Sequence, residues 1–287
     1  MVRITHPDNS HNMTIKESFQ AAKSPQTTTE DGIAVTNDFA AVVDGSTSKG
    51  TLLLGGKSSG RVAMEIVCES IQHLDANITS AEAANKLTND IRQLYIEKDL
   101  LENAIAKAEN RFTCSAVIFS KRRREIWFIG DCQCRFGGQT YTNEKLVDRI
   151  LADIRCDAIE YLLRHGHTIE DLQLKDLGRA FILDALKDQC NFQNSKGDNP
   201  FLYAVIDGFP IDEGMIKTIH VPPHIHEVVL ASDGYPVVCD TLDATEKELQ
   251  RLLKTDLLCY SENRCTKGVM AGADSYDDRT YLKIEIK

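Results

Sequence analysis

Apolar and polar positions alternate along the first part of the chain, in short runs that loops separate. The pattern covers residues 14–44 and includes a turn-rich stretch at 24–32. Alternation with a period of two is typical of half-buried strands. Asn37 and Asp38 separate two of the apolar runs and favour a hairpin turn. We therefore expect short strands joined by loops in this segment.

Farther along the chain, the spacing of apolar positions changes to that of a helix. Between residues 60 and 74, the apolar side chains at helical spacing are Val62, Ile66, Val67, Ile71 and Leu74. Thr79 and Ser80, followed by Glu82, have the pattern of a helix start, and residues 80–109 continue with a helical period. The sequence thus predicts two long helices.

The remaining elements are predicted from the same two periods. Strands are expected at 113–120 and 125–130, and the basic run 121–124 between them favours an exposed turn. The later elements, in chain order, are two or three helices within 143–188, strands near 201–206 and within 215–231, a helix at 245–258 and a strand at 280–286.

This order of elements favours an α+β protein. It lacks the regular strand–helix alternation of a doubly wound sheet, so two antiparallel sheets flanked by helices fit it better. We expect residues 1–287 to form a single domain, in which the helices of about 143–188 are an insertion between sheet strands.

Composition and charge narrow the class of protein. Hydrophobic residues make up 42% of the chain and charged residues 26%, as in an ordinary soluble globular protein. A formal net charge of -10 argues against a general binder of nucleic acids or anionic membranes. The N-terminal residues lack the apolar core of a signal peptide, and no apolar run approaches membrane-spanning length. The nine cysteines form no Cys-x-x-Cys pair, so we expect a protein of the reducing cytoplasm.

Aspartates follow three apolar, strand-like runs at widely separated places. Asp44, Asp131 and Asp233 end such runs, and Asp277 and Asp278 precede the last one. A single aspartate of this kind is usually a turn residue. A buried strand that carries a carboxylate to its end is costly, however, unless the charge meets a cation or hydrogen-bond donors. Several together predict one shared acidic site, which suits a hard divalent cation with oxygen ligands.

The aspartates lie in motifs that resemble those of a known family. In chain order, the motifs are residues 29–31 with 39–45, 60–63, 114–118 with 128–131, 230–234, and 275–280. Together and in this order they are similar to the motifs of the metal-dependent serine/threonine protein phosphatases, the PPM or type 2C family. They cover most of the chain, which resembles a divergent, bacterial-like member.

The resemblance implies a fold and a metal centre. The fold would be a four-layer α-β-β-α sandwich, with two or three Mn²⁺ or Mg²⁺ ions at one end of the sheets. Asp44 would bridge two metals, with the carbonyl of Gly45 as a further ligand. Asp233 and Asp277 would complete the first metal site. These three aspartates are the catalytic residues that the resemblance predicts.

The resemblance also implies the remaining ligands and the chemistry. Glu30 or Asp31 would hold the second metal, directly or through water, and Asp131 would help to bind a third. The reaction would be hydrolysis of a phosphate monoester by in-line attack of a water that bridges two metals. Expected substrates are phosphoserine and phosphothreonine in proteins, or another small phosphomonoester. A cognate kinase is a candidate partner.

The chain departs from the family pattern where the substrate phosphate is bound. Active members carry an Arg four residues before the Glu-Asp pair, and Gln26 stands at that position here. The candidate substitutes are the nearby cations Lys23, Lys49, Lys57 and Arg61. A lysine offers a point charge and lacks the bidentate fork of an arginine.

Further departures lie around the metal motifs. Ser46 stands where many eukaryotic members have a general-acid His, and Asp278 stands where the closing motif has Asn. The family's usual flap segment after Asp131 is missing, and a helical segment is predicted there instead.

Two alternative interpretations stay open. Residues 50–58 resemble a phosphate-binding P-loop, but Thr51 stands where that motif requires its first Gly. The second alternative is a phosphatase fold without chemistry, which would act as a binding or regulatory module. The missing Arg at Gln26 favours this second alternative.

Overall fold

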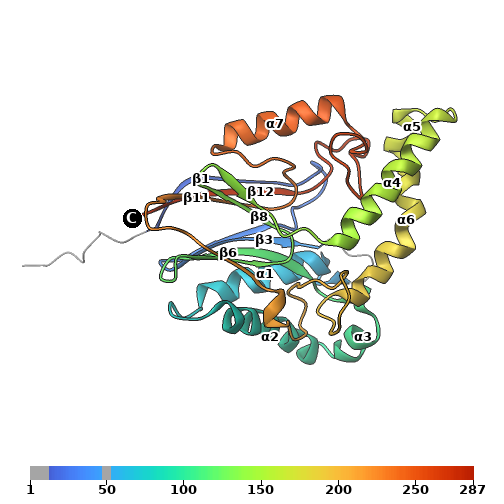
Figure 1. Ribbon diagram of the computed structural model, residues 1–287. Helices are drawn as coiled ribbons and strands as arrows, with labels where there is room; N and C mark the ends of the chain where they lie inside the picture. Colours follow the sequence, from blue (N-terminus) through green and yellow to red (C-terminus); the bar gives the residue numbers. More distant parts are fainter. Residues whose placement is uncertain (1–12, 47–52) are drawn as a thin grey trace, which may run out of the picture.

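The computed structural model describes residues 13–46 and 53–287, in which two antiparallel sheets pack face to face (Figure 1). The strands of sheet A, in spatial order, are β1 (Met13–Ala21), β12 (Arg279–Ile286), β11 (Glu227–Ala231), β8 (Gln133–Phe136) and β9 (Gln139–Tyr141). The strands of sheet B, in the same sense, are β10 (Lys217–His220), β7 (Glu125–Ile129), β6 (Cys114–Ser120), β3 (Phe39–Gly45) and β2 (Gly32–Val35).

Apolar side chains on the facing sides of the two sheets form the core between them. Val42, Val117 and Phe128 of sheet B are fully buried there, together with Leu230 and Leu282 of sheet A. Each such side chain contributes roughly 1.5–3 kcal/mol by leaving water. Because successive side chains of a strand point to opposite faces, their neighbours face the outer layers. Strand β6 is buried along its whole length, since both of its faces are covered.

Helices cover the outer faces of both sheets (Figure 1). Helices α1 (Ser59–Gln72) and α2 (Ser80–Glu97) lie on sheet B, and α7 (Leu242–Thr255) lies on sheet A. In the described residues, no helix has both the length and the apolar character needed to cross a bilayer. The predicted α+β class, with four layers in the order α-β-β-α, is confirmed.

The start of α2 follows the predicted pattern, but the helical stretch 80–109 is broken. Thr79 and Glu82 form a capping box, in which each side chain accepts a hydrogen bond from the backbone of the other. The chain then turns at Asp99, whose φ of 55° lies in the left-handed region that aspartate tolerates better than most residues. The break is followed by α3 (Leu101–Ala106) and the 3-10 helix η1 (Ala108–Asn110).

Three helices stand at one end of the sandwich (Figure 1). They are α4 (Leu146–Arg164), α5 (Ile169–Leu174) and α6 (Leu177–Asp188), and the 3-10 helix η2 (Gln189–Phe192) follows them. Arg155 of α4 is fully buried and pairs with Asp176 at 2.8 Å. Its guanidinium also donates hydrogen bonds to the carbonyls of Leu258, Cys259 and Cys265. These contacts tie the three helices to the loop after α7.

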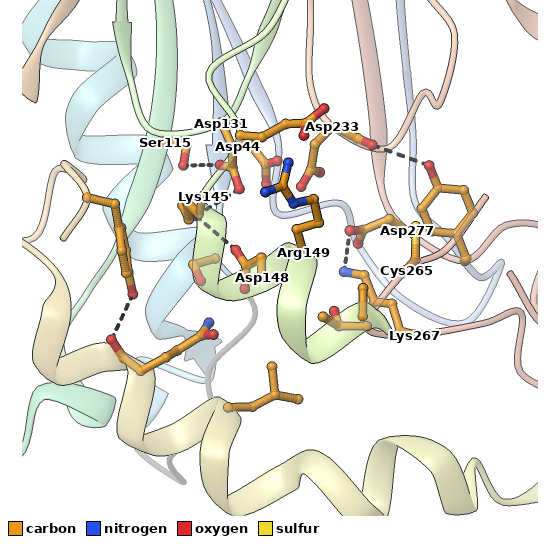
Figure 2. Close-up of a pocket in the computed structure, with 18 of the residues that line it drawn as sticks. Asp44, Ser115, Asp131, Lys145, Asp148, Arg149, Asp233, Cys265, Lys267 and Asp277 are labelled. Carbon is orange, nitrogen blue, oxygen red and sulfur yellow. Dashed lines mark hydrogen bonds and ion pairs between the residues drawn. The ribbon is translucent and has the colours of Figure 1, made fainter. Parts of the chain in front are cut away.

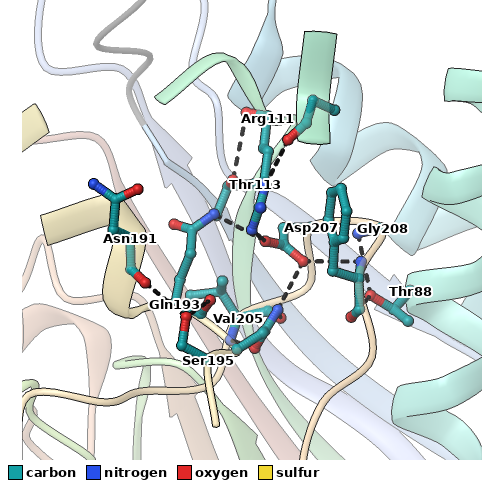
Figure 3. A network of polar contacts seen from close by, with 12 residues as sticks. Thr88, Arg111, Thr113, Asn191, Gln193, Ser195, Val205, Asp207 and Gly208 are labelled. Carbon is teal, nitrogen blue, oxygen red and sulfur yellow. Dashed lines mark hydrogen bonds and ion pairs between the residues drawn. The ribbon is translucent and has the colours of Figure 1, made fainter. Parts of the chain in front are cut away.

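The segment near 201–206 is not a strand, so this part of the prediction is wrong. Ile206 forms only an isolated bridge with Cys114 in the described residues. The buried carboxylate of Asp207 holds the segment instead. It accepts hydrogen bonds from the side chains of Arg111, Gln193 and Asn194 (Figure 3). Burial alone would raise the pKa of Asp207, and the Arg111 charge opposes part of that rise.

The helical segment predicted after Asp131 is present, but two strands that the sequence did not predict come before it. These are β8 and β9, and α4 begins at Leu146. Gly137 and Gly138 form the turn between the two strands, with φ values of 58° and 78°. Positive φ at both central residues is what a tight hairpin turn requires. The strands are too short for their period to show clearly in the sequence.

A second small hairpin precedes α1, in the described part of the stretch that resembles a P-loop. It consists of β4 (Leu53–Leu54) and β5 (Lys57–Ser58). Lys57 forms an ion pair with Glu65 at 2.7 Å and does not point into a phosphate cradle. Residues 50–52 lie outside the described residues. The P-loop interpretation is therefore not favoured. The 3-10 helix η3 (Glu213–Met215) completes the described elements.

Candidate active site

Four of the predicted aspartates lie at one end of the sandwich and, together with Asp278, line one cavity. Asp44 belongs to the end of β3, Asp131 follows β7, Asp233 follows β11 and Asp277 precedes β12. Strand β12 runs antiparallel to β11, so its start lies beside the end of β11. The cavity has a volume of about 380 Å³, and Figure 2 shows the carboxylates gathered at its wall.

Local backbone geometry sets the position of Asp131. Ser115 lies opposite Asp44 in the pairing of β3 with β6, and its hydroxyl donates a hydrogen bond to Asp131 Oδ1 at 2.7 Å. Gly130 has a φ of 102°, and a Cβ at this position would lie 2.1 Å from Ser115 Oγ. Only glycine therefore allows the turn that brings Asp131 back over Ser115.

The carboxylates at this end are crowded. Burial, and then the charges of Asp31 and Asp277, raise the pKa of Asp44 well above its ordinary value. Burial also raises the pKa of Asp233, and the charge of Asp44 raises it further. The acidic groups thus raise one another's pKa, which indicates more negative charge than the nearby cations neutralise.

Asp131 is the exception, because a lysine neutralises it. Lys145, directly before α4, forms an ion pair with Asp131 at 2.8 Å, and the two side chains are only 14% and 17% exposed. Burial alone would raise the pKa of Asp131, but the Lys145 ammonium and the Ser115 hydroxyl hold it below its ordinary value. The ion pair raises the pKa of Lys145, although burial by itself would lower it.

Lysines also contact Asp277 and Asp278, in the motif that precedes β12. Lys267 forms an ion pair with Asp277, and Lys23 lies 3.7 Å from the same carboxylate and 3.8 Å from that of Asp278. Asp278 accepts hydrogen bonds from the backbone amides of Lys23 and Glu30, at 2.9 and 2.6 Å. Asp278 therefore connects the loop after β1 to the start of β12.

Glu30 and Asp31, the Glu-Asp pair, lie in different environments. Glu30 accepts a hydrogen bond from the hydroxyl of Ser58. Asp31 is 2% exposed, and neither of its carboxylate oxygens has a hydrogen-bond partner among the described residues. Burial, with the charge of Asp277 adding to it, raises the pKa of Asp31 to about 7, although the nearby hydroxyls of Ser232 and Thr280 oppose part of the rise. A buried carboxylate without well-oriented donors is costly unless a cation or proton compensates it.

This set of donors fits a divalent cation. Carboxylates and a backbone carbonyl are the ligands that Mg²⁺ and Mn²⁺ prefer. A cation near Asp31, Asp44 and Asp233 would compensate the unpartnered oxygens of Asp31 and the repulsion between the other two. Among the described residues, no three acidic, His or Cys side chains already form a ready-made coordination sphere. Asp131 and Asp277 are each held by a lysine, and their role as ligands stays a prediction.

Of the predicted phosphate-binding cations, Lys23 lies beside Asp277 and Asp278 at the cavity, whereas Lys57 and Arg61 lie away from it. Arg61 pairs with Glu65 at 2.9 Å and donates to the carbonyl of Thr29 at 2.6 Å, and Lys57 pairs with the same glutamate. Neither belongs to the cavity wall, and Gln26 is exposed outside it. Lys49 lies outside the described residues.

Sequence reasoning missed the basic side chains that do line the cavity. They are Lys145, Arg149, Arg179, Arg264 and Lys267. Two of them lie at or near the start of α4, and their spacing of four residues places them on one face of the helix. That spacing is a weak signal by itself, because the sequence does not show which face of the helix meets the aspartates.

Comparisons with known proteins find similarity in structure only. No protein-family model matches the chain, and no curated protein matches it. The solved structure of the serine/threonine phosphatase PstP/Ppp of Mycobacterium tuberculosis is 15% identical, with 96% of this chain and 99% of that chain covered and a TM-score of 0.48. Serine/threonine phosphatase Stp1 from Staphylococcus aureus is 15% identical, with 99% and 100% covered and a TM-score of 0.46. RsbX in complex with magnesium is 11% identical, with 98% of each chain covered and a TM-score of 0.43.

Two of these neighbours bear the name of the activity that the motifs resemble. Because their TM-scores are below 0.5, we take the fold from the strand order and layers of this chain itself. The strand order and the layers of this chain confirm the α-β-β-α sandwich that the resemblance implies.

Proposed function

We propose that this protein is a metal-dependent phosphatase that hydrolyses phosphate monoesters, with phosphoserine and phosphothreonine in proteins as its substrates. The observation that carries the proposal is the convergence of strand-end aspartates on one cavity, beside the unpartnered carboxylate of Asp31. An arrangement of this kind is costly without cations, so its presence at one end of the sheets indicates a metal-binding role.

Two or three Mn²⁺ or Mg²⁺ ions would be held by this acidic end. The proposed ligands are Glu30, Asp31, Asp44, the carbonyl of Gly45, Asp131, Asp233 and Asp277. When bound, such ions supply a water of lowered pKa as the nucleophile and positive charge for the phosphate oxygens.

The side chains of the protein prepare the cavity for this chemistry. Lys145 and Lys267 pair with Asp131 and Asp277 and hold these two carboxylates in place, at opposite sides of the acidic wall. Ser115 orients Asp131 through its hydrogen bond. Groups that are fixed before the substrate arrives need little reorganisation during the reaction, which is the main benefit of a preorganised site.

We place the protein in the cytoplasm, where a phosphoprotein and its kinase would be the partners. The nine cysteines support this location, because none of them forms a disulfide in the described residues.

The test is hydrolysis of p-nitrophenyl phosphate and of a phosphothreonine peptide, with and without Mn²⁺. We expect turnover that depends on the metal and falls at least about 100-fold in Asp44→Asn and Asp233→Asn. The control is Asp184→Asn, which removes a carboxylate of the same kind from α6, where its side chain is 97% exposed.

Turnover that survives Asp44→Asn would contradict the proposed site. Mn²⁺ binding without turnover of either substrate would favour the inert binding or regulatory module instead.

A further inference from the structure

One face of α4 forms a wall of the cavity opposite the sheets. Lys145, Asp148, Arg149 and Ala152 all line it, at spacings of three and four residues. Residues at these spacings lie on one side of a helix, one above the other. Figure 2 shows Lys145 and Arg149 reaching from this helix toward the strand-end aspartates. The three-helix segment therefore contributes directly to the acidic site.

Two of the basic residues in the cavity wall already neutralise an acid of the site. Lys145 pairs with Asp131 at 2.8 Å, and Lys267 pairs with Asp277. Both ammonium groups are mostly buried, with side chains 14% and 27% exposed. A phosphate that used either lysine would have to compete with the carboxylate that the lysine already contacts.

Two others hold parts of the protein together. Arg179 of α6 donates a hydrogen bond to the carbonyl of Thr266 at 2.7 Å, which fixes the loop that carries Lys267. Arg264 pairs with Asp153 and Asp157 of α4, both at 2.7 Å. Each guanidinium is therefore committed to a structural contact.

Arg149 is different from these four. Among the described residues, the guanidinium of this exposed residue has neither an ion-pair nor a hydrogen-bond partner, and its backbone amide donates to the carbonyl of Lys145. Its side chain points into the cavity on the side of Asp44 and Asp233 (Figure 2). Arg149 thus lies beside the proposed metal ligands, and the N–H donors of its planar guanidinium have no partner among the described residues.

We propose that Arg149 binds the phosphoryl group of the substrate, and that α4 thereby supplies the phosphate contact for which Gln26 is unsuited. The inference rests on the proposed phosphatase function. Gln26 is exposed outside the cavity, Lys57 and Arg61 are engaged by Glu65, and Lys23 pairs with Asp277 and Asp278. An arginine offers two parallel N–H donors to a phosphate, which fits a dianionic monoester better than a lysine would.

The experiment compares Arg149→Ala and Arg149→Lys with wild type in the full-length, Mn²⁺-loaded protein. We expect kcat/KM for p-nitrophenyl phosphate to fall about 10- to 100-fold in Arg149→Ala, the range for losing hydrogen bonds between charged groups. The Kd for inorganic phosphate, measured by calorimetry, should rise by a similar factor. Arg149→Lys should lie between the two, because it keeps the charge and loses the fork.

The matched control is Arg164→Ala, in the last turn of the same helix. Its side chain is 73% exposed, pairs only with Glu160 in the described residues, and lies outside the cavity wall. This variant should retain wild-type values of kcat/KM and of the phosphate Kd. Thermal unfolding midpoints of all variants should agree, since the guanidinium of Arg149 supports no other described group.

The outcomes separate this inference from the proposed function. Normal turnover and an unchanged phosphate Kd in Arg149→Ala would overturn the role of Arg149 and leave the phosphatase intact. Phosphate binding that Arg149→Ala abolishes, without turnover even in wild type, would support the phosphate contact while the proposed activity fails. A wild-type protein that neither binds phosphate nor hydrolyses the ester would overturn both.

Discussion

At the scale of single residues, the acidic end contains carboxylates in opposite electrostatic states. Asp131 is paired with Lys145 and has a lowered pKa, whereas Asp31 is buried without a hydrogen-bond partner in the described residues and has a pKa of about 7. The difference does not follow from residue type, since both are aspartates near strand ends. It follows from whether a cation on another element reaches the carboxylate.

Asp31 should therefore make the metal-free protein less stable as the pH rises. Its pKa is 3.8 in the unfolded chain and about 7 in the folded one, so the folded state binds the proton more tightly. Stability from this group is then fully present below pH 3.8 and is lost as the pH rises to about 7, by up to roughly 4 kcal/mol.

Urea unfolding of wild type and Asp31→Asn, with a chelator present, measures this effect. The free energy of unfolding of wild type relative to the variant should decrease from pH 4 to pH 7. The asparagine amide adds an offset that does not depend on pH. A constant difference across this range would show that the pKa of Asp31 is not raised.

At the scale of elements, α4 connects two parts of the molecule that lie far apart in the sequence. Its start contacts the acidic end through Lys145, and its middle holds the loop after α7 through Arg155. That loop carries Lys267, which pairs with Asp277. Helix α4 thus supports both lysines that neutralise strand-end aspartates.

Replacing Arg155 by methionine should destabilise the protein strongly. The change leaves Asp176 and three backbone carbonyls without their buried donor, which costs about 3–5 kcal/mol for a broken buried pair. Urea unfolding measures the loss, and hydrogen exchange should increase most in residues 256–268. Arg164→Met, at an exposed position of the same helix, should change the free energy of unfolding by less than about 1 kcal/mol. Equal effects of the two variants would contradict the anchoring role.

At the scale of the whole molecule, aspartates from both sheets lie together at one end of the sandwich. Asp44 and Asp131 come from sheet B, and Asp233 and Asp277 from sheet A. Close packing between the sheets brings the four together although they are spread over most of the chain. The proposed cations would stabilise the folded state because this arrangement exists only in it.

Adding Mn²⁺ should therefore raise the thermal unfolding midpoint of wild type. At a free concentration of 100 times Kd, the gain in stability is about 2.7 kcal/mol per site. In Asp44→Asn this gain should vanish, while the metal-free variant should be at least as stable as metal-free wild type, because one repelling charge is gone. Asp184→Asn should keep the full response. An equal rise in Asp44→Asn and wild type would place the metal elsewhere.

Much of the fold could be predicted because it depends on local periodicity. Helix α2 begins at the predicted helix start, and β3, β6, β7 and β12 lie where apolar runs occur. The failures have separate causes. The strands β8 and β9 are too short to show a period, and residues 201–206 are buried by the Asp207 network without forming a strand.

By itself, the sequence determined which residues lie at the strand ends, and therefore which carboxylates could form the acidic site. The apolar run of each strand fixes where the strand ends and which side chain follows it. Only the tertiary structure decided which basic side chains lie close to these carboxylates. Lys145, Arg149 and Lys267 come from segments whose sequences show no link to the aspartates, and their approach depends on how α4 and the loop after α7 pack at the end of the sandwich. Electrostatic interactions act through space, so the partner of a charge is set by packing and not by separation along the chain.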